Sequence, residues 1–215
     1  MLFIISVPTW WFFEIFNSVT ENWHYIGRQY FTNFQFFLLA SLSFSTVMPA
    51  VFGTAELVSC SGFITKIKIK KDLRISPATV KKYFISGCIM LLLVLLLPKY
   101  FYYLLWASLY FMLDPLNYKL GNRSLIIYAK AVNWRPLISL AAGCLICGFF
   151  WEMWNYYSYP KWIYTLPYLN YAHIFEMPLP GYIGYIPFSF ELFAIYNLIS
   201  MKKTKPEQDY YLQIQ

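Results

Sequence analysis

Phe-Phe-Trp-Glu-Met-Trp-Asn at residues 149–155 closes an apolar run and places a carboxylate and an amide among aromatic side chains. Glu152 and Asn155 are three residues apart, so on a helix they lie on the same face. A second version, Trp-Phe-Phe-Glu-Ile-Phe-Asn, occupies residues 11–17 and carries Glu14 and Asn17 at the same spacing. The pattern indicates that one unit occurs twice in the chain.

The correspondence continues downstream of both stretches. Trp23-His24-Tyr25 matches Trp162-Ile163-Tyr164, and Pro49 with Phe52 matches Pro187 with Phe190. Corresponding residues lie 138 positions apart, or 139 at the tryptophans, and one residue inserted in a loop explains the difference. We therefore expect an internal duplication, with the rest of the chain joining and supporting the two copies.

The composition is that of a membrane protein. Of 215 residues, 59% are hydrophobic and only 13% are charged, whereas soluble domains carry about 25% charged residues. Lysines and arginines gather at 66–82 and 202–205. Such clusters beside apolar segments are typical of cytoplasmic loops. Their position accounts for the charge, so we expect membrane lipid as a partner and no nucleic acid.

Apolar runs predict an all-α integral membrane protein with about six transmembrane helices. A helix needs roughly 20 apolar residues to span a bilayer. Residues 83–113 are too long for one span, and Pro98-Lys99 interrupts them, so two short tilted helices are expected there. The predicted spans are therefore 2–19, 34–58, two within 83–113, 137–157 and 182–200.

These spans predict five regions. They are a first membrane hairpin repeat (1–60), a basic cytoplasmic loop (61–82), a central hairpin with a second cytoplasmic loop (83–138), a second hairpin repeat (139–201) and a cytoplasmic tail (202–215). Both termini are then cytoplasmic, and the two repeats run in parallel about an axis along the membrane normal. Residues 100–138 precede only the second copy, so either the first repeat is a shorter form or the chain is N-terminally truncated, and we expect the second.

Four glutamates fall within predicted spans, where insertion of a charge costs about 2.5–3.5 kcal/mol and usually serves a task. We expect catalytic roles as acid or base for Glu14, Glu56, Glu152 and Glu191. Aromatic faces steady a cation, and the expected substrate-binding residues are Asn17, Asn155, Trp151, Trp154, Trp162 and Tyr164. The alternative is structural: each Glu-x-x-Asn caps or cross-links helices, and the tryptophans are interfacial belt residues.

Other motifs point to structure. Cys144 and Cys147 lie in an apolar run without a second ligand pair, which favours buried core residues. His24 and His173 do not correspond between the copies, so we expect no metal and no cofactor. Pro49 and Pro187 are expected to break their helices and free carbonyls towards a cavity. Asp114-Pro115 is expected to start a turn or cap a helix.

Several of these motifs also carry a family resemblance. The sequence resembles an uncharacterised family of bacterial multi-pass inner-membrane proteins with the motif Trp-Glu-x-Trp-Asn, here Trp151–Asn155. The other matching stretches are 10–14, 22–25, 45–52, 114–125, 147–150 and 175–191. The resemblance implies a bacterial inner-membrane location. Members usually have more residues before the first motif, in line with a truncated chain.

A fainter similarity is to the lycopene cyclase domain, a membrane family that cyclises carotenoids and is built from repeated helices. It rests on Trp162-Ile163-Tyr164 and on Pro187–Glu191, although the adjacent Pro-x-Glu-Glu pair of those cyclases is absent. This similarity implies an apolar isoprenoid substrate and acid–base chemistry at carboxylates.

Three functions remain open from the sequence. The first is a lipid or isoprenoid enzyme, cyclase- or isomerase-like, that uses Glu152 and Glu191 with Glu14 and Glu56. The second is a small-substrate transporter or permease that uses the same carboxylates. The third is a non-catalytic membrane assembly subunit. An enzyme acting on lipid should have a cavity that opens sideways to the bilayer, and a transporter one that opens to water. The oligomeric state is not indicated.

Overall fold

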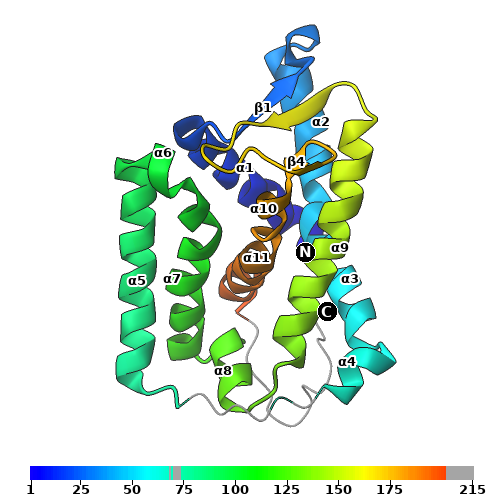
Figure 1. Cartoon of the computed structure of the whole chain (residues 1–215). Helices are drawn as coiled ribbons and strands as arrows, with labels where there is room; N and C mark the ends of the chain where they lie inside the picture. Colours follow the sequence, from blue (N-terminus) through cyan, green and yellow to red (C-terminus); the bar gives the residue numbers. More distant parts are fainter. Residues whose placement is uncertain (68, 70–73, 202–215) are drawn as a thin grey trace.

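The computed structural model describes residues 1–67, 69 and 74–201, and this part is mainly helical (Figure 1). The predicted tail and part of the predicted basic loop lie outside the described residues. The elements up to the central region are α1 (Leu2–Thr20), β1 (Trp23–Ile26), η1 (Arg28–Tyr30), α2 (Asn33–Ser45), α3 (Val47–Ser59), α4 (Gly62–Lys66), α5 (Pro77–Leu96), α6 (Pro98–Phe101) and η2 (Tyr102–Leu104). They are followed by α7 (Leu105–Leu120), α8 (Leu125–Lys130), α9 (Arg135–Tyr156), β2 (Lys161–Tyr164), β3 (His173–Ile174), β4 (Met177–Pro178), α10 (Leu179–Tyr182) and α11 (Tyr185–Ser200).

Within the described residues, five helical segments are long and apolar enough to cross a membrane. They are α1, α2 with α3, α5, α9, and α10 with α11. Many large apolar side chains on them are exposed, including Leu42, Leu57 and Leu96 at 69%, 74% and 67%. Water would disfavour so much apolar surface, whereas lipid tails accept it. The protein is therefore an all-α membrane protein, as predicted at this level.

Two of the predicted spans are interrupted one turn before a proline. A proline ring clashes with the carbonyl four residues earlier, and for Pro49 that residue is Ser45, where α2 ends. The freed backbone groups are satisfied by α1, because the Ser6 hydroxyl donates to the Phe44 carbonyl and accepts from the Met48 amide. Pro187, at the corresponding sequence position, is likewise the third residue of α11, just after the break that ends α10.

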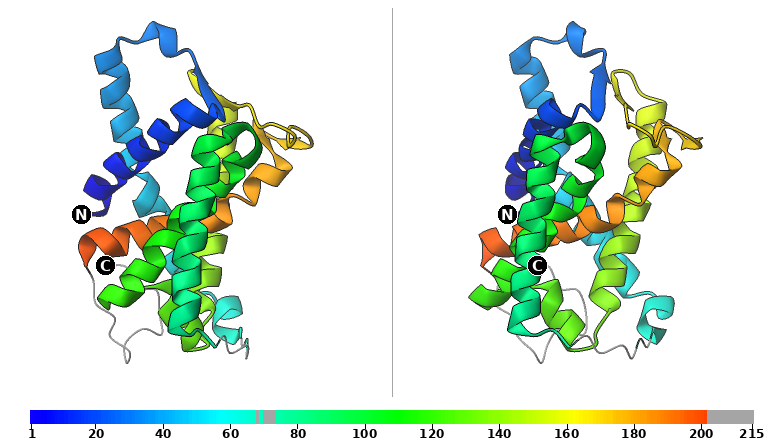
Figure 2. Two further views of the ribbon diagram at one scale, coloured as in Figure 1. Left: turned by 90° about the vertical axis from the view of Figure 1, so that its left-hand side faces the viewer. Right: turned by 60° about the vertical axis from the view of Figure 1, so that its left-hand side comes forward.

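The predicted turn at Pro98 is present. The chain leaves α5, reverses through α6 and η2, and returns along α5 as α7 (Figures 1 and 2). The two helices approach closely at Gly87, where an added Cβ would lie 2.8 Å from the Ser108 carbonyl. Asp114 lies inside α7 rather than at a turn, and its carboxylate caps α8 by accepting the amides of Leu125 and Ile126 at 2.8 and 3.0 Å.

The core lies where α11 crosses the steeper helices. Figure 2 shows α11 running obliquely between α7 and α9, and α1 is oblique as well. Phe52, Leu140, Leu192 and Phe193 are among the buried side chains that meet there. Helices α3 and α9 approach closely at Gly143, where an added Cβ would lie 2.7 Å from backbone atoms of Ala55.

This contact gives a test of the packing. We expect Gly143→Ala to reduce the free energy of unfolding by roughly 1–3 kcal/mol, because the backbone of the facing helix cannot shift without losing other contacts. The loss is measured as a lower thermal unfolding temperature in detergent. The control is Gly53→Ala on α3, where an added Cβ meets nothing within 4 Å. That change should raise stability by about 0.5–1 kcal/mol through helix propensity. Equal shifts in the two variants would contradict the close approach.

Candidate functional site

A two-stranded ribbon joins the two corresponding halves of the sequence. β1 and β2 pair antiparallel, with Trp23 opposite Tyr164, His24 opposite Ile163, and Tyr25 opposite Trp162. The pairing is symmetric about His24 and Ile163, so each tryptophan faces the tyrosine of the other strand. No strand was predicted at either segment, although Trp162 and Tyr164 were expected to bind substrate. The ribbon brings the two Trp-x-Tyr motifs into one place at one end of the molecule (Figure 1).

Asn17 and Asn155 hold the strands to the helix ends. The Asn155 amide donates to the Trp162 carbonyl and accepts from the Trp162 amide, both at 2.8 Å. Asn17 makes the same pair of bonds to Trp23, at 2.8 and 3.1 Å. Both were expected to bind substrate. Their side-chain amides are bonded to the strand backbone, so in this structure they position the strands.

Glu152 lies directly under the second strand. It is fully buried, and its Oε1 accepts from the hydroxyls of Tyr164 and Tyr185 at 2.7 and 2.8 Å. The Trp162 indole in turn donates to the Tyr164 oxygen at 2.9 Å. Gly148, one turn before Glu152, leaves room for the Tyr185 ring, because an added Cβ would lie 2.5 Å from it. The absence of a side chain at residue 148 thus admits one of the two donors.

Glu14 has a related environment under the first strand. Its Oε1 accepts from the Tyr25 hydroxyl at 2.5 Å and from the indoles of Trp10 and Trp23, each at 3.1 Å. Trp10 stands at the position that corresponds to Gly148, and Val47 at the position of Tyr185. A tryptophan on its own helix therefore serves Glu14 where a tyrosine from α11 serves Glu152.

The strand tyrosines remain protonated donors at neutral pH. Burial raises the pKa of Tyr25 and of Tyr164 far above the ordinary tyrosine value, and the neighbouring glutamate raises each pKa further. A phenol with such a pKa keeps its proton and donates it in a hydrogen bond. Each Tyr–Glu pair is therefore a phenol that points its proton at a carboxyl group.

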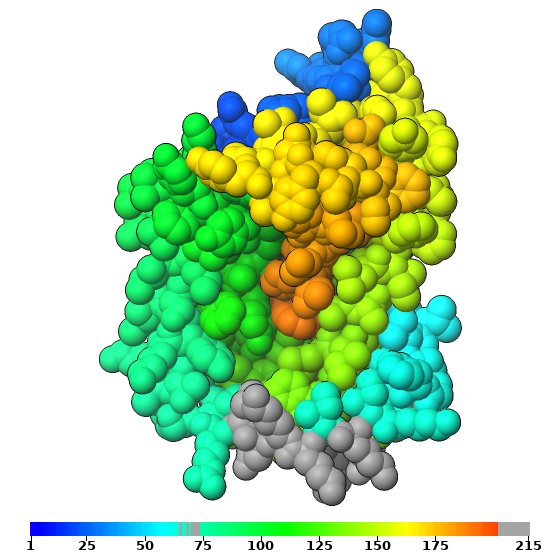
Figure 3. All heavy atoms as spheres, viewed as in Figure 1, coloured from blue at the N-terminus to red at the C-terminus, as the bar shows by residue number. Residues whose placement is uncertain are grey.

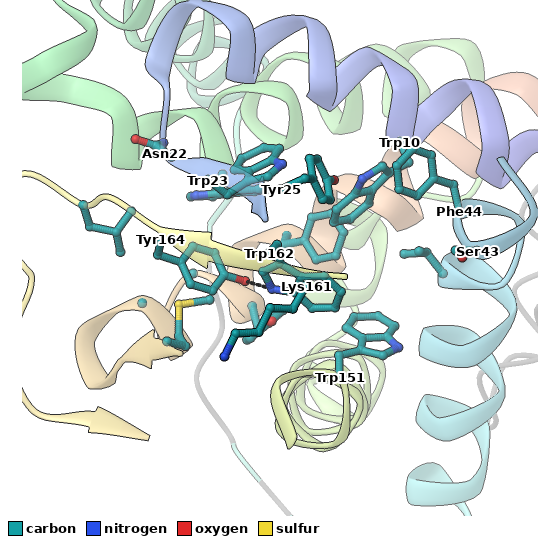
Figure 4. A pocket seen from close by; sticks show the side chains of 18 of the residues that line it. Trp10, Asn22, Trp23, Tyr25, Ser43, Phe44, Trp151, Lys161, Trp162 and Tyr164 are labelled. Atoms are coloured by element: carbon teal, nitrogen blue, oxygen red, sulfur yellow. Dashed lines mark hydrogen bonds between the residues drawn. The ribbon is translucent and has the colours of Figure 1, made fainter. Parts of the chain in front are cut away.

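An aromatic cavity of about 660 Å³ lies against the ribbon. Aromatic side chains are 14 of the 31 that line it, and Figure 4 shows several converging from both strands and from helices. The six that matter most here are Trp10, Trp23, Tyr25, Trp151, Trp162 and Tyr164. The volume lies in the range of small-molecule sites. The segment around 160–182 supplies another wall and covers the upper part of the face in Figure 3.

Both helix breaks border this cavity. Thr46 and Val47 line it at the junction of α2 and α3, and Gly184 and Pro187 line it where α10 gives way to α11. The predicted proline breaks therefore do face a cavity. Among the described residues, the charged side chains that line it are Arg28 and Lys161.

The structure brings together some of the predicted site residues and separates others. Trp151, Trp162 and Tyr164 line the cavity, whereas Trp154 is 61% exposed and is not part of its wall. Within the described part of the chain, none of the four glutamates lines the cavity. Glu14 and Glu152 lie one hydrogen bond behind its wall, through Tyr25 and Tyr164.

Glu191 and Glu56 lie elsewhere. Glu191 is fully buried on α11, and its Oε1 accepts the Leu109 amide of α7 at 3.1 Å. It therefore links two helices, as the structural alternative proposed for the buried glutamates. Glu56 lies near the end of α3, towards α4 and away from the ribbon (Figure 1).

Two tyrosines of the site, Tyr25 and Tyr185, were not predicted from the sequence. Tyr25 was detectable, because it corresponds to Tyr164 in the Trp-x-Tyr motif. Tyr185 had no signal, because the first copy has Val47 at that position. Trp106 and Phe188 also line the cavity, and nothing in their local sequence distinguishes them from other apolar core residues.

The cysteines and histidines make other contacts. Cys144 and Cys147 are buried free thiols, and Cys147 bonds the Thr54 hydroxyl. The His173 ring contacts the Asn170 side chain. Among residues 1–67, 69 and 74–201, no three His, Cys, Asp or Glu side chains gather as metal ligands would.

Comparison with known proteins leaves the site to be judged on its own geometry. No family model matches the chain, and neither a curated protein nor a solved structure is significantly similar to it.

Asn17 and Asn155, which clamp the strands to the helix ends, can be tested by mutation. We expect Asn155→Ala to destabilise the protein by about 2–4 kcal/mol, because the amide and carbonyl of Trp162 lose their partner. Thermal unfolding in detergent measures this loss. Asn155→Asp keeps an acceptor for the Trp162 amide and should lose less. Asn17→Ala should behave like Asn155→Ala, and an unchanged unfolding temperature in both would show that the ribbon does not depend on these amides.

Proposed function

We propose that this membrane protein binds an apolar isoprenoid or lipid chain in the aromatic cavity and isomerises or cyclises it. The observation that carries the proposal is that two tyrosines of one cavity wall, Tyr25 and Tyr164, each donate to a glutamate behind them. Glu152 and Glu14 then act through these phenols. Glu191 and Glu56 have no direct part in it.

The proton balance of such a reaction fits two Tyr–Glu pairs. Cyclisation or isomerisation of a polyene adds a proton to one alkene carbon and removes one from another carbon, with no oxidant or reductant. At one pair the glutamate is protonated and the hydrogen bond reverses, so that the carboxyl donates to the phenol oxygen while the phenol gives its own proton to the alkene; the glutamate is left ionised. At the other pair the phenol oxygen takes the C–H proton while its own proton passes to an ionised glutamate. That glutamate then loses its proton to solvent and the first glutamate regains one, which restores both pairs for the next turnover. This is general acid–base catalysis by relay.

The cavity wall suits the intermediate. Protonation of an alkene leaves a carbocation, and aromatic faces attract a cation at close range. Trp23, Trp151 and Trp162 line the cavity together with the two tyrosines. An apolar wall also excludes water that would otherwise trap the cation.

The route of entry favours a membrane lipid as substrate. Leu39 and Ile183 line the cavity and are also 52% and 66% exposed, so apolar side chains lead from the outer surface to the interior. In a membrane protein such a surface faces acyl chains. This supports entry from the bilayer, the arrangement expected of an enzyme on lipid rather than of a permease.

We also propose that the chain has six spans and arose by internal duplication. α7 is the sixth, because its 16 residues run back along α5. The duplication is supported by the symmetric strand pairing, the two Asn clamps, the two Tyr–Glu pairs and the equal place of Pro49 and Pro187 in their helices. In this proposal the repeats are parallel hairpins about one axis.

For orientation, we propose that the end opposite the ribbon faces the cytoplasm of a bacterial inner membrane. Most described lysines and arginines lie on α4, the start of α5, the end of α7, α8 and the start of α9, which gather at that end in Figure 1. Cytoplasmic ends of membrane proteins are enriched in these residues. Both termini are then cytoplasmic.

A second candidate is binding of an apolar ligand without chemistry, as in an assembly subunit. The observation that favours it is that no carboxyl oxygen of the four glutamates reaches the cavity wall in the described residues. The experiment below separates the two candidates.

The test is to profile extracted isoprenoids and lipids from cells that express the protein. We expect a product with the mass of its precursor, and its loss by at least about a hundredfold in Glu152→Gln and Tyr164→Phe, since general acid–base groups contribute 10²–10⁴-fold. Tyr25→Phe should give a similar loss. Tyr103→Phe is the control, because Tyr103 lines the cavity but is half-exposed and not bonded to the glutamates. Identical profiles in wild type and Glu152→Gln would remove the enzyme and favour binding alone.

A further inference from the structure

Asn22, a polar residue of the cavity wall, has no hydrogen-bond partner for its side chain within the described residues. Asn22 lines the cavity and is only 2% exposed. Both its Nδ2 and its Oδ1 are buried without a hydrogen bond within the described residues. In Figure 4 it stands at the edge of the labelled group, beyond Trp23 and away from Trp151. A buried amide normally has partners for its donors and its acceptor, so an orphaned one marks a place where a ligand can supply them.

The position of this amide is fixed by its backbone. The Asn22 amide N–H donates to Asn17 at 2.9 Å, and its carbonyl accepts from Thr165 at 2.8 Å. Both bonds belong to the ribbon and its clamp. The residue is therefore held at the cavity wall by a rigid support, as a built binding group requires.

The corresponding residue in the other copy marks the opposite end of the ribbon. Lys161 precedes Trp162 as Asn22 precedes Trp23, and it also lines the cavity. Lys161 is ion-paired with Glu176 and lies opposite Ile26, four residues along the strand from Asn22. At strand geometry the two positions are about 13 Å apart. The ends of the cavity thus differ: a neutral amide at one and paired charges at the other.

We infer that the ligand is an apolar chain carrying one neutral oxygen function, a hydroxyl or a carbonyl, which bonds Asn22. This deepens the proposed function and rests on it, since it names the substrate class for the same cavity. An amide offers both a donor and an acceptor, so it serves either oxygen function. A pure hydrocarbon leaves Asn22 unpaired, and sites built to bond an oxygen discriminate against ligands that lack it. The cations lie at the other end, so the group at Asn22 carries no charge.

The test uses the full chain in lipid nanodiscs and two matched polyenes. They are all-trans-retinol and axerophtene, which has a methyl group in place of the alcohol. Both accept excitation energy from tryptophan, and the wall contains Trp10, Trp23, Trp106, Trp151 and Trp162, so titration of tryptophan fluorescence gives both affinities. We expect wild type to prefer retinol by about tenfold, the effect of roughly one net hydrogen bond. Asn22→Leu should abolish the preference.

The two polyenes partition differently into lipid, but this difference is the same for every variant. It therefore cancels when the ratio of the two affinities in a variant is compared with the ratio in wild type. Ser43→Ala is the matched control, because Ser43 also lines the cavity but its hydroxyl is satisfied by the Leu39 carbonyl of its own helix. It should keep the preference. Asn22→Ala serves as a second variant if Asn22→Leu does not fold.

The outcomes separate the two proposals. Equal binding of both polyenes to wild type, or a preference that survives in the Asn22 variants, overturns the role of Asn22 while leaving an apolar ligand in the cavity. Binding of neither polyene overturns the proposed function and this inference with it. Preference in wild type and Ser43→Ala, with loss in the Asn22 variants, supports both.

Discussion

The bonds from Asn17 and Asn155 to the strand backbone are the constraint on which the upper part of the molecule depends. An isolated two-stranded hairpin or ribbon of four residues is marginal at best. Here each strand is fastened at its tryptophan by the amide side chain at a helix end. The same helix turn carries a glutamate three residues earlier, on the same face. When the amide grips the tryptophan, the tyrosine two residues on comes within reach of the glutamate.

This geometry explains why glutamates are tolerated in apolar segments. A buried carboxyl group needs hydrogen-bond donors, and the clamp delivers a tyrosine hydroxyl to each of the two. The second donor comes from different places. Trp10 reaches Glu14 along its own helix, whereas Gly148 leaves a gap through which Tyr185 reaches Glu152. Both glutamates have a second hydrogen-bond donor, but the residue that supplies it does not correspond between the two halves of the sequence.

The sequence predicted the helices well and the site only in part, for physical reasons. Length and apolarity define a span locally, so five spans could be predicted, and a proline marks a break by its clash with an earlier carbonyl. Strand pairing joins residues about 140 positions apart, and no local pattern specifies it. The cost of a buried charge indicates that Glu191 must have a partner, but not that the partner is the backbone of Leu109. Trp154 fits a binding site in type, yet its helix face points outward.

The differences between corresponding positions give the cavity a direction. Where the two halves carry the same residues, as at Trp23 and Trp162, they build matching walls from both strands. Where they differ, as at Asn22 and Lys161, they place unlike groups at opposite ends of the same ribbon. A symmetric cavity would hold an elongated ligand equally well in either of two opposite orientations. In the proposed function, an amide at one end and paired charges at the other would hold the ligand in one orientation, so that a given carbon would always meet the same Tyr–Glu pair. The proposed isomerisation would use that distinction, because in each turnover one pair gives a proton and the other takes one.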